Sequence, residues 1–282
     1  MGKLKSGFNL VDGKSYFMIS QSLIKQFFYK GNLIEFCPYQ IKRVSIDKAY
    51  NFNTAAMGRG NAFESIAIGS SADSRQHPLE RLKTGKLSAA SKRIKIQALE
   101  FKADAKELGL TINSETTQLE IYKTLKFANG SVIVILKGIL DMFSNMKGFK
   151  GLLPIDLKLT ADVTNTKGKF GWGNVGEMDH LQASFYTFLT NTDKFLYMVY
   201  DYKPELEKLV PIVLDVLPVN RGELIEVVRK TVVEISHFEM NGWDKRPDLI
   251  DDFGFRKLNK CGRCIVEDCK FKGRKELPSY KY

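Results

Sequence analysis

The placement of four cysteines most constrains what this 282-residue chain can fold into. Cys37 stands alone near the start, whereas Cys261, Cys264 and Cys269 form a Cys-x2-Cys-x4-Cys run near the end. Four thiolates are the complete ligand set of one metal centre. If the four share a centre, it joins the N-terminal and C-terminal segments across the whole intervening chain. Spacing alone does not separate zinc from an iron–sulfur cluster.

Two other interpretations of the cysteines are weaker. Two disulfides would need an oxidising compartment, and the polar run after Met1 has no apolar signal-peptide region, so we do not expect secretion. Four separate buried thiols would pack as small hydrophobes. Three of the four, however, lie in a polar, basic run with a glycine that a core would not host. A shared metal centre is therefore the favoured interpretation.

The charge of the chain favours an acidic partner. Lys and Arg number 43 against 32 Asp and Glu, giving a formal net charge of +11. Such an excess points first to nucleic acid. Much of it lies in residues 256–282, beside the cysteine run, although a solvated basic tail would look the same. No apolar run approaches the roughly 20 residues of a membrane helix, so we expect no membrane partner.

Hydrophobic periodicity predicts helices first and then strands. Helices are expected over 22–29, from a cap at Asn61 after a break at 58–60, and over 91–108, 178–189 and 220–240. Strands are expected over 117–125, 132–143, 152–159, 195–202 and 209–217, with a hairpin turn at Asn129-Gly130. This order predicts an α/β or α+β fold with a mixed sheet.

Two acids and a lysine stand out on adjacent predicted strands. Asp141 ends the run Gly138-Ile-Leu-Asp, and Asp156 lies in Pro154-Ile-Asp-Leu-Lys158. Charged side chains inside apolar strands are costly unless they are paired or bound to metal. Asp156 and Lys158 are two residues apart and share a face of the strand, and a hairpin brings Asp141 beside them. This combination predicts a site for Mg²⁺ or Mn²⁺ and a water molecule.

The Asp-x-Lys pair is informative only in its context. It occurs five times, and the strongest rival is Asp201-Tyr-Lys203 at the end of an apolar strand. Only the Asp156 pair follows a Gly-apolar-apolar-Asp strand and precedes Gln182-x3-Tyr186, whose two side chains share one helix face. The same glutamine–tyrosine spacing occurs at Gln118, but within a strand pattern.

Taken in order, these motifs resemble those of a nuclease superfamily. A helical Glu64, then Gly-Ile-Leu-Asp141, Ile-Asp156-Leu-Lys158 and Gln182-x3-Tyr186, resemble the PD-(D/E)xK nucleases, specifically the RecB-like exonuclease branch. The cysteine pattern resembles the iron–sulfur members of that branch, namely the AddB nuclease domain and CRISPR-associated RecB-like exonucleases. Phe36-Cys-Pro-Tyr39 matches the Cys-Pro-aromatic segment usual at their first ligand.

The resemblance implies a fold and an activity. The fold would be α/β with a restriction-endonuclease-like core, a mixed central sheet flanked by helices. One nuclease domain would span 1–282: an N-terminal segment 1–57, the core 58–218, and a C-terminal helix and tail 219–282, with the first and last segments joined by the cluster. The activity would be that of a stand-alone, metal-dependent DNA exonuclease acting on single strands or free ends.

The resemblance also implies roles for individual residues. The catalytic Mg²⁺ or Mn²⁺ would be held by Asp141, Asp156, Glu64 and the backbone carbonyl of Leu157. Lys158 would orient or activate the attacking water, and Gln182 and Tyr186 would position a phosphate or base of the DNA. A [4Fe–4S] cluster, with zinc as the alternative occupant, would be held by Cys37, Cys261, Cys264 and Cys269.

The resemblance also implies partners, and two rival functions stay open beside it. DNA is the expected partner, together with proteins of recombination or CRISPR systems, in the cytoplasm of a prokaryotic or phage-infected cell. One rival is a nuclease-fold module without activity that only grips DNA ends. Another is a zinc-stapled nucleic-acid-binding protein that performs no chemistry.

Overall fold

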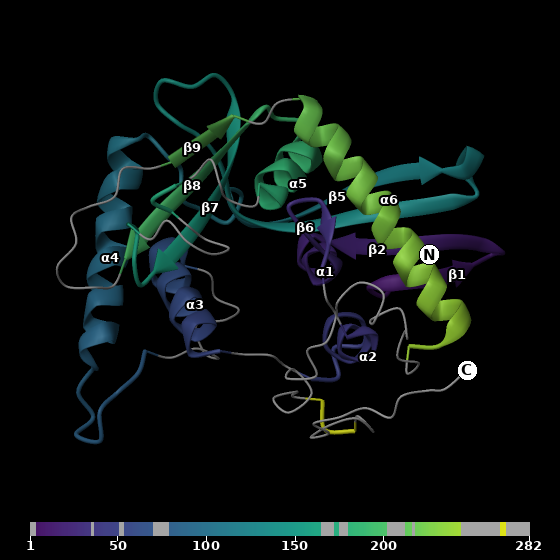
Figure 1. Ribbon diagram of the computed structural model, residues 1–282. Helices are drawn as coiled ribbons and strands as arrows, with labels where there is room; N and C mark the ends of the chain where they lie inside the picture. Colours follow the sequence, from purple (N-terminus) through teal and green to yellow (C-terminus); the bar gives the residue numbers. More distant parts are fainter. Residues whose placement is uncertain are drawn as a thin grey trace. The chain divides into compact units, whose positions relative to one another are not determined.

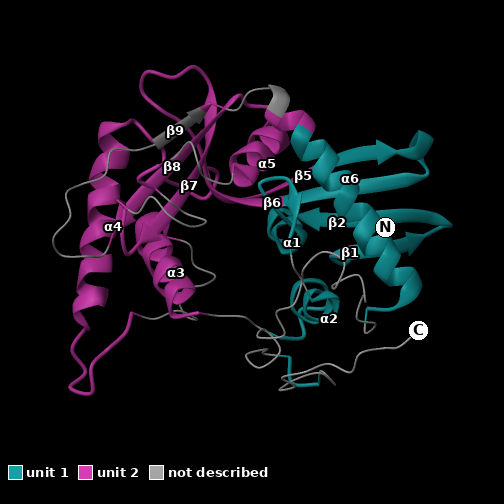
Figure 2. Cartoon of the chain, in the orientation of Figure 1, with its two compact units in different colours: residues 1–52, 123–137, 223–282 teal, residues 53–122, 138–222 magenta. Residues whose placement is uncertain are grey.

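The long strand β6 (Val132–Asn145) contributes to two compact units of the chain. The computed structural model describes residues 4–34, 37–50, 54–69, 79–164, 172–174, 180–201, 212–215, 218–243 and 266–268. Unit 1 comprises residues 1–52, 123–137 and 223–282, and unit 2 comprises 53–122 and 138–222 (Figure 2). The single-domain boundaries expected from the sequence are not decided by this division and stay a prediction.

Unit 1 begins with a hairpin that the periodicity did not predict. Strands β1 (Gly7–Val11) and β2 (Lys14–Ser20) pair antiparallel, and β2 then pairs parallel with the first half of β6. Helix α1 (Gln21–Phe27) follows at once, and its N-cap hydroxyl at Ser20 accepts from the Leu23 N–H.

Unit 1 also contains several short elements, of which α2 is labelled in Figure 1. They are β3 (Phe28–Tyr29), β4 (Asn32–Leu33), α2 (Pro38–Gln40), the π-helix Ile41–Ile46 and the 3₁₀ turn Ala128–Gly130. Most of helix α6 (Pro218–Asn241) also belongs to this unit. No helix within the described ranges is both long and apolar enough to cross a bilayer.

Unit 2 opens with two helices. Helix α3 (Ala55–Ile68) is capped by Thr54, whose hydroxyl accepts from the Met57 N–H, and it ends at Gly69 with φ +73°. The predicted start at Asn61 is therefore wrong, because the Thr54 cap begins the helix earlier and the glycines at 58 and 60 lie inside it. Helix α4 (Ala89–Glu107) is capped by Ser88, close to where the periodicity placed it.

The strands of unit 2 form a mixed sheet with parallel and antiparallel pairs. The second half of β6 pairs antiparallel with β7 (Leu152–Thr160), and β7 pairs parallel with β8 (Lys194–Asp201). Strand β9 (Ile212–Asp215) pairs antiparallel with β8, and β5 (Thr117–Phe127) pairs with β6 through the turn at 128–130. Helix α5 (Leu181–Thr190) joins β7 to β8. The predicted mixed α/β architecture is confirmed.

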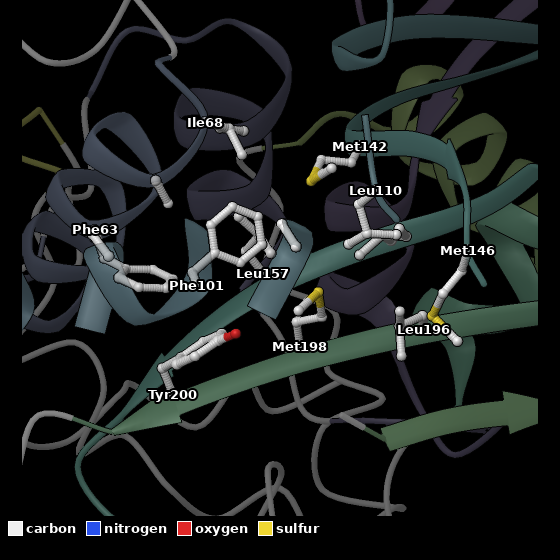
Figure 3. Packing of buried hydrophobic residues seen from close by; sticks show 14 of the residues in the cluster. Phe63, Ile68, Phe101, Leu110, Met142, Met146, Leu157, Leu196, Met198 and Tyr200 are labelled. Carbon is white, nitrogen blue, oxygen red and sulfur yellow. The ribbon is translucent and has the colours of Figure 1, made fainter. Parts of the chain in front are cut away.

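Helices pack on both faces of this sheet. On β8, Leu196, Met198 and Tyr200 enter the core formed with α3 and α4, where Phe63 and Phe101 lie close to the Tyr200 ring (Figure 3). The alternate residues point the other way, because side chains alternate along a strand. There the ring of Phe195 stacks on Tyr186 of α5 at 6.0 Å.

Candidate active site

Asp141 and Asp156 are brought together by the pairing of β6 with β7. The register ends with Met142 opposite Ile155, and just beyond it the Leu157 N–H donates to Oδ2 of Asp141, so Asp141 lies near Asp156. Both neighbours, Met142 and Ile155, are fully buried in the core with α3 and α4. Asp156 lies on the other face of β7, where Gln182 of α5 contacts it, and the carboxylate of Asp141 accepts from the adjacent Leu157 N–H.

Asp156 is held by two partners at once. Its Oδ2 forms an ion pair with Nζ of Lys158, and its Oδ1 accepts a hydrogen bond of 2.5 Å from Nε2 of Gln182. Its side chain is only 6% exposed, whereas that of Lys158 is 25% exposed. Lys158 is thus the more accessible member of the ion pair, and a substrate can contact its ammonium group. The structure thus brings together Asp156, Lys158 and Gln182, all of which the sequence singled out.

Tyr186 stands one helical turn after Gln182 and fixes the strand that carries Asp141. Its hydroxyl donates a 2.8 Å hydrogen bond to the carbonyl of Ile139. Its ring lies against Gly138, where an added Cβ would come within 2.8 Å of Cε1 of Tyr186 and 2.6 Å of Cδ1 of Leu189. The glycine of the Gly-Ile-Leu-Asp run is therefore needed for close packing of helix on strand.

Glu64 lies on α3, close enough for its charge to act on Asp141 and Lys158. The residues beside it, including Phe63, are buried in the core, and this fixes the face of the helix on which Glu64 lies. Its Oε1 accepts a hydrogen bond from Nε2 of Gln118, at the start of β5. The sequence pattern noted Gln118 only as a repeat of the glutamine–tyrosine spacing, and its contact with Glu64 was missed.

Burial and like charge act together on Asp141. Burial raises the pKa of the Asp141 carboxyl well above its usual value, and the carboxylates of Asp156 and Glu64 raise it further. The ammonium group of Lys158 and the N–H of Leu157 oppose this rise in the pKa. Three carboxylates therefore act on one another here, and a divalent cation would relieve their repulsion.

Lys158 and Tyr186 respond to the same negative charge. Burial lowers the pKa of Lys158, but Asp156 and Asp141 outweigh it, so the net pKa lies above that of a free lysine. Burial also raises the pKa of the Tyr186 hydroxyl, with Asp156 and Asp141 adding to the effect. Lys158 is accordingly a cation at neutral pH, and Tyr186 is a neutral hydrogen-bond donor.

The residues present suit a hard cation only in part. Within the part of the chain that the structure describes, no three acidic, histidine or cysteine side chains gather closely enough to hold a metal by themselves. Asp141 accepts from the Leu157 N–H, and Asp156 is bound to Lys158 and Gln182. The paired carboxylates with the nearby Leu157 carbonyl are nevertheless the oxygen donors that Mg²⁺ and Mn²⁺ accept.

Of the four cysteines, the structure describes one. Cys37 is half-buried and immediately precedes α2, whereas Cys261, Cys264 and Cys269 lie outside the described residues. Asp268, next to the last of them, accepts hydrogen bonds from Arg43 at 2.8 Å and from Tyr50 at 3.0 Å. The segment after Cys37 and the segment before Cys269 are thus in contact within unit 1; we call these three residues, Arg43, Tyr50 and Asp268, the clasp.

Trp172 and the rival acid Asp201 both lie away from the solvent. Trp172 is buried, and its ring packs edge-on against Tyr197 at 5.2 Å. A ring buried in this way does not offer a free face to a base. Asp201, the rival acid, is buried at the end of β8 opposite Thr160, and its lysine at 203 lies outside the described residues.

Comparison with known proteins supports the fold. No protein-family model matches the chain, and no curated protein matches it either. Among solved structures, the chain is similar to a protein from Eubacterium rectale named a "Putative exonuclease". The TM-score is 0.51 and the identity 17%, over 86% of this chain and 88% of that chain. At this identity the likeness shows the fold alone, and the chain has this exonuclease-like α/β fold.

A second solved structure, that of SSO0001, overlaps less well. Its TM-score is 0.38 at 12% identity, over 77% of this chain and 76% of that chain. An overlap this low supports no argument about fold or function.

Proposed function

We propose that the chain is a metal-dependent nuclease that hydrolyses phosphodiester bonds of DNA, as an exonuclease at single strands or free ends. One observation carries the proposal: Asp141 lies beside Asp156 across β6 and β7, with Lys158 ion-paired to Asp156. The fold that carries these residues is similar to that of the Eubacterium rectale protein named a "Putative exonuclease". The net charge of +11 favours a polyanionic substrate.

The proposed chemistry divides the work among few side chains. Asp141, Asp156 and Glu64, with the Leu157 carbonyl, would hold Mg²⁺ or Mn²⁺, which supplies a Lewis acid for the phosphate and a more acidic water. The ammonium group of Lys158 would stabilise the charge that develops on the phosphate. Gln182 would keep the carboxylate of Asp156 in place through its hydrogen bond.

Digestion of end-labelled DNA tests the proposal. Linear single-stranded, linear double-stranded and circular DNA are incubated with the full-length protein in Mg²⁺, Mn²⁺, Ca²⁺ or excess chelator. Cleavage of linear DNA alone, in Mg²⁺ or Mn²⁺ but not in chelator, supports a metal-dependent exonuclease. Ca²⁺ should not support cleavage, because its looser geometry positions water poorly.

An aspartate variant provides the matched control. Asp156→Asn should lose cleavage and keep DNA binding, whereas Asp215→Asn should keep both. Asp215 also forms an ion pair with a lysine, Lys194, over 3.1 Å, but it is 67% exposed. DNA binding without cleavage by the wild-type protein would favour the end-gripping module, and cleavage that persists in chelator would overturn the metal mechanism.

For the cysteines we propose a shared [4Fe–4S] centre that joins the two ends of the chain. The clasp supports it, because Asp268 holds its segment against Arg43 and Tyr50. Protein purified without oxygen should be brown and contain iron and sulfide. A colourless protein with one zinc would support the zinc-stapled alternative. Protein partners from recombination or CRISPR systems stay a prediction.

A further inference from the structure

Gln118 has an unusual backbone conformation at the start of β5. Its φ is +53°, in the left-handed region that residues with a long side chain seldom adopt. Residues held in this conformation are strained and concentrate at functional sites, where the surrounding structure enforces the strain. Its side chain is exposed, so core packing does not explain the conformation.

Hydrogen bonds tie the segment that precedes Gln118 to β6. The carbonyl of Thr116 accepts a 2.7 Å hydrogen bond from the N–H of Phe143, and the Thr111 N–H donates to Oγ of Ser144 over 2.8 Å. Phe143 and Ser144 follow Asp141 closely on β6. The position of Gln118 is therefore set relative to the strand that carries an acid of the candidate site.

The side chain of Gln118 makes one contact that matters for that site. Its Nε2 donates to Oε1 of Glu64, which lies 54 positions earlier in the chain, on α3. A glutamate on a helix has several rotamers of similar energy, and a hydrogen bond to one oxygen selects among them. Because the amide is neutral, it leaves the negative charge of Glu64 intact.

We propose that Gln118 is a positioning residue that orients Glu64 for binding of Mg²⁺ or Mn²⁺. The inference rests on the proposed metal-dependent function of the same site. Carboxylate ligands are commonly held by such outer hydrogen bonds, and loss of one typically costs about 10–100-fold in metal affinity. The left-handed backbone at Gln118 is then the strain that aims the amide at Glu64.

Mn²⁺ binding to the full-length protein, measured by calorimetry without DNA, tests the inference. Gln118→Met keeps the length of the side chain and removes the donor, and Gln118→Gly also relieves the backbone. Both should raise the Kd for Mn²⁺ by about 10–100-fold. If Gln118 had only a structural role, replacing it would instead lower the melting temperature. We expect Gln118→Gly to leave the melting temperature unchanged or to raise it.

Two controls make the test specific. Asp12→Gly relieves another positive φ, of +49°, in the turn of the β1–β2 hairpin, and it should leave Mn²⁺ binding unchanged. In a Glu64→Gln background, Gln118→Met should cause no further loss, because the two residues act as one unit.

The outcomes separate this inference from the function on which it rests. If the wild-type protein binds no Mn²⁺ and cleaves no DNA, the proposed function fails and the inference falls with it. If the wild type binds Mn²⁺ and Gln118→Met binds it equally well, only the positioning role is wrong. An equally large loss of Mn²⁺ affinity when Gln118→Met is added to the Glu64→Gln protein would likewise overturn the positioning role.

Discussion

The backbone N–H of Leu157 donates a 2.8 Å hydrogen bond to Oδ2 of Asp141. This bond ties the acid of β6 to the residue between Asp156 and Lys158 on β7. It holds the Asp141 carboxylate against the main chain of β7, next to Asp156. Side-chain hydrogen bonds from Gln182 and Tyr186 hold β7 and β6 from the side of α5.

Lys158→Ala should reduce the cleavage rate by about 10²–10³-fold, which is typical for loss of one group that stabilises transition-state charge. The Kd for DNA should change little, because only one partly buried positive charge among many is lost. Single-turnover cleavage and DNA affinity are measured separately. Lys194→Ala, which removes the lysine of the Lys194–Asp215 pair, is the matched control and should be near wild type. Comparable losses in both variants would contradict the role assigned to Lys158.

Gly138→Ala should destabilise the fold and lower activity together. The new Cβ would lie 2.6 Å from Leu189 and 2.8 Å from Tyr186, and overpacking of this kind costs about 1–3 kcal/mol. The displaced Tyr186 would also loosen its hydrogen bond to Ile139. Denaturant unfolding and cleavage assays report the two effects.

Gly222→Ala serves as the control for Gly138→Ala. Gly222 lies in α6, and an added Cβ there would meet no atom within 4 Å. Its replacement should stabilise the helix by about 0.5–1 kcal/mol. Equal stability of the Gly138→Ala protein and the wild type would show that α5 does not approach the strand as closely as described.

Asp141→Asn should raise the melting temperature of metal-free protein at neutral pH. Burial and the neighbouring carboxylates raise the folded-state pKa of Asp141 above its usual value, so the folded chain binds this proton more tightly than the unfolded chain. Stability then falls as pH rises from the usual value, about 3.9, through the raised pKa. Asparagine stays neutral and can still accept from the Leu157 N–H.

Thermal unfolding across a pH series in chelator measures this effect. The advantage of Asp141→Asn should vanish at acid pH, where the wild-type carboxyl is also protonated. Asp215→Asn, which removes an exposed carboxylate, should show no such gain. A lower melting temperature for Asp141→Asn than for the wild type at neutral pH would mean that the Asp141 carboxylate is well compensated without metal.

Cys37→Ala and Cys261→Ala should each lower the melting temperature and remove the bound metal. A link that closes so long a loop contributes roughly 4–5 kcal/mol, by analogy with a disulfide. Because the two thiols would serve one centre, the double variant should be no less stable than either single variant. Iron content, melting temperature and DNA affinity are compared across the three proteins. Additive losses would show that the two cysteines act separately.

Much of the fold could be predicted from local patterns. The strands over 132–145, 152–160 and 194–201 follow apolar, β-branched runs, and their predicted bounds differ from the observed ones by at most two residues. The β1–β2 hairpin was missed although its turn, Asp12-Gly13, carries a hairpin signal; both residues have positive φ. The start of α3 was misplaced because two glycines suggested a break, whereas the Thr54 cap and the packing of Phe63 outweigh their cost.

By itself, the sequence determined that Asp156 and Lys158 share a strand face and that Gln182 and Tyr186 share a helix face, because both relations depend only on the period of one element. The tertiary structure alone decided that Gln118 meets Glu64 and that Tyr186 packs on Gly138. Each of these contacts joins two elements far apart in the chain. Their meeting depends on how whole helices and strands pack, and no spacing along the sequence encodes that.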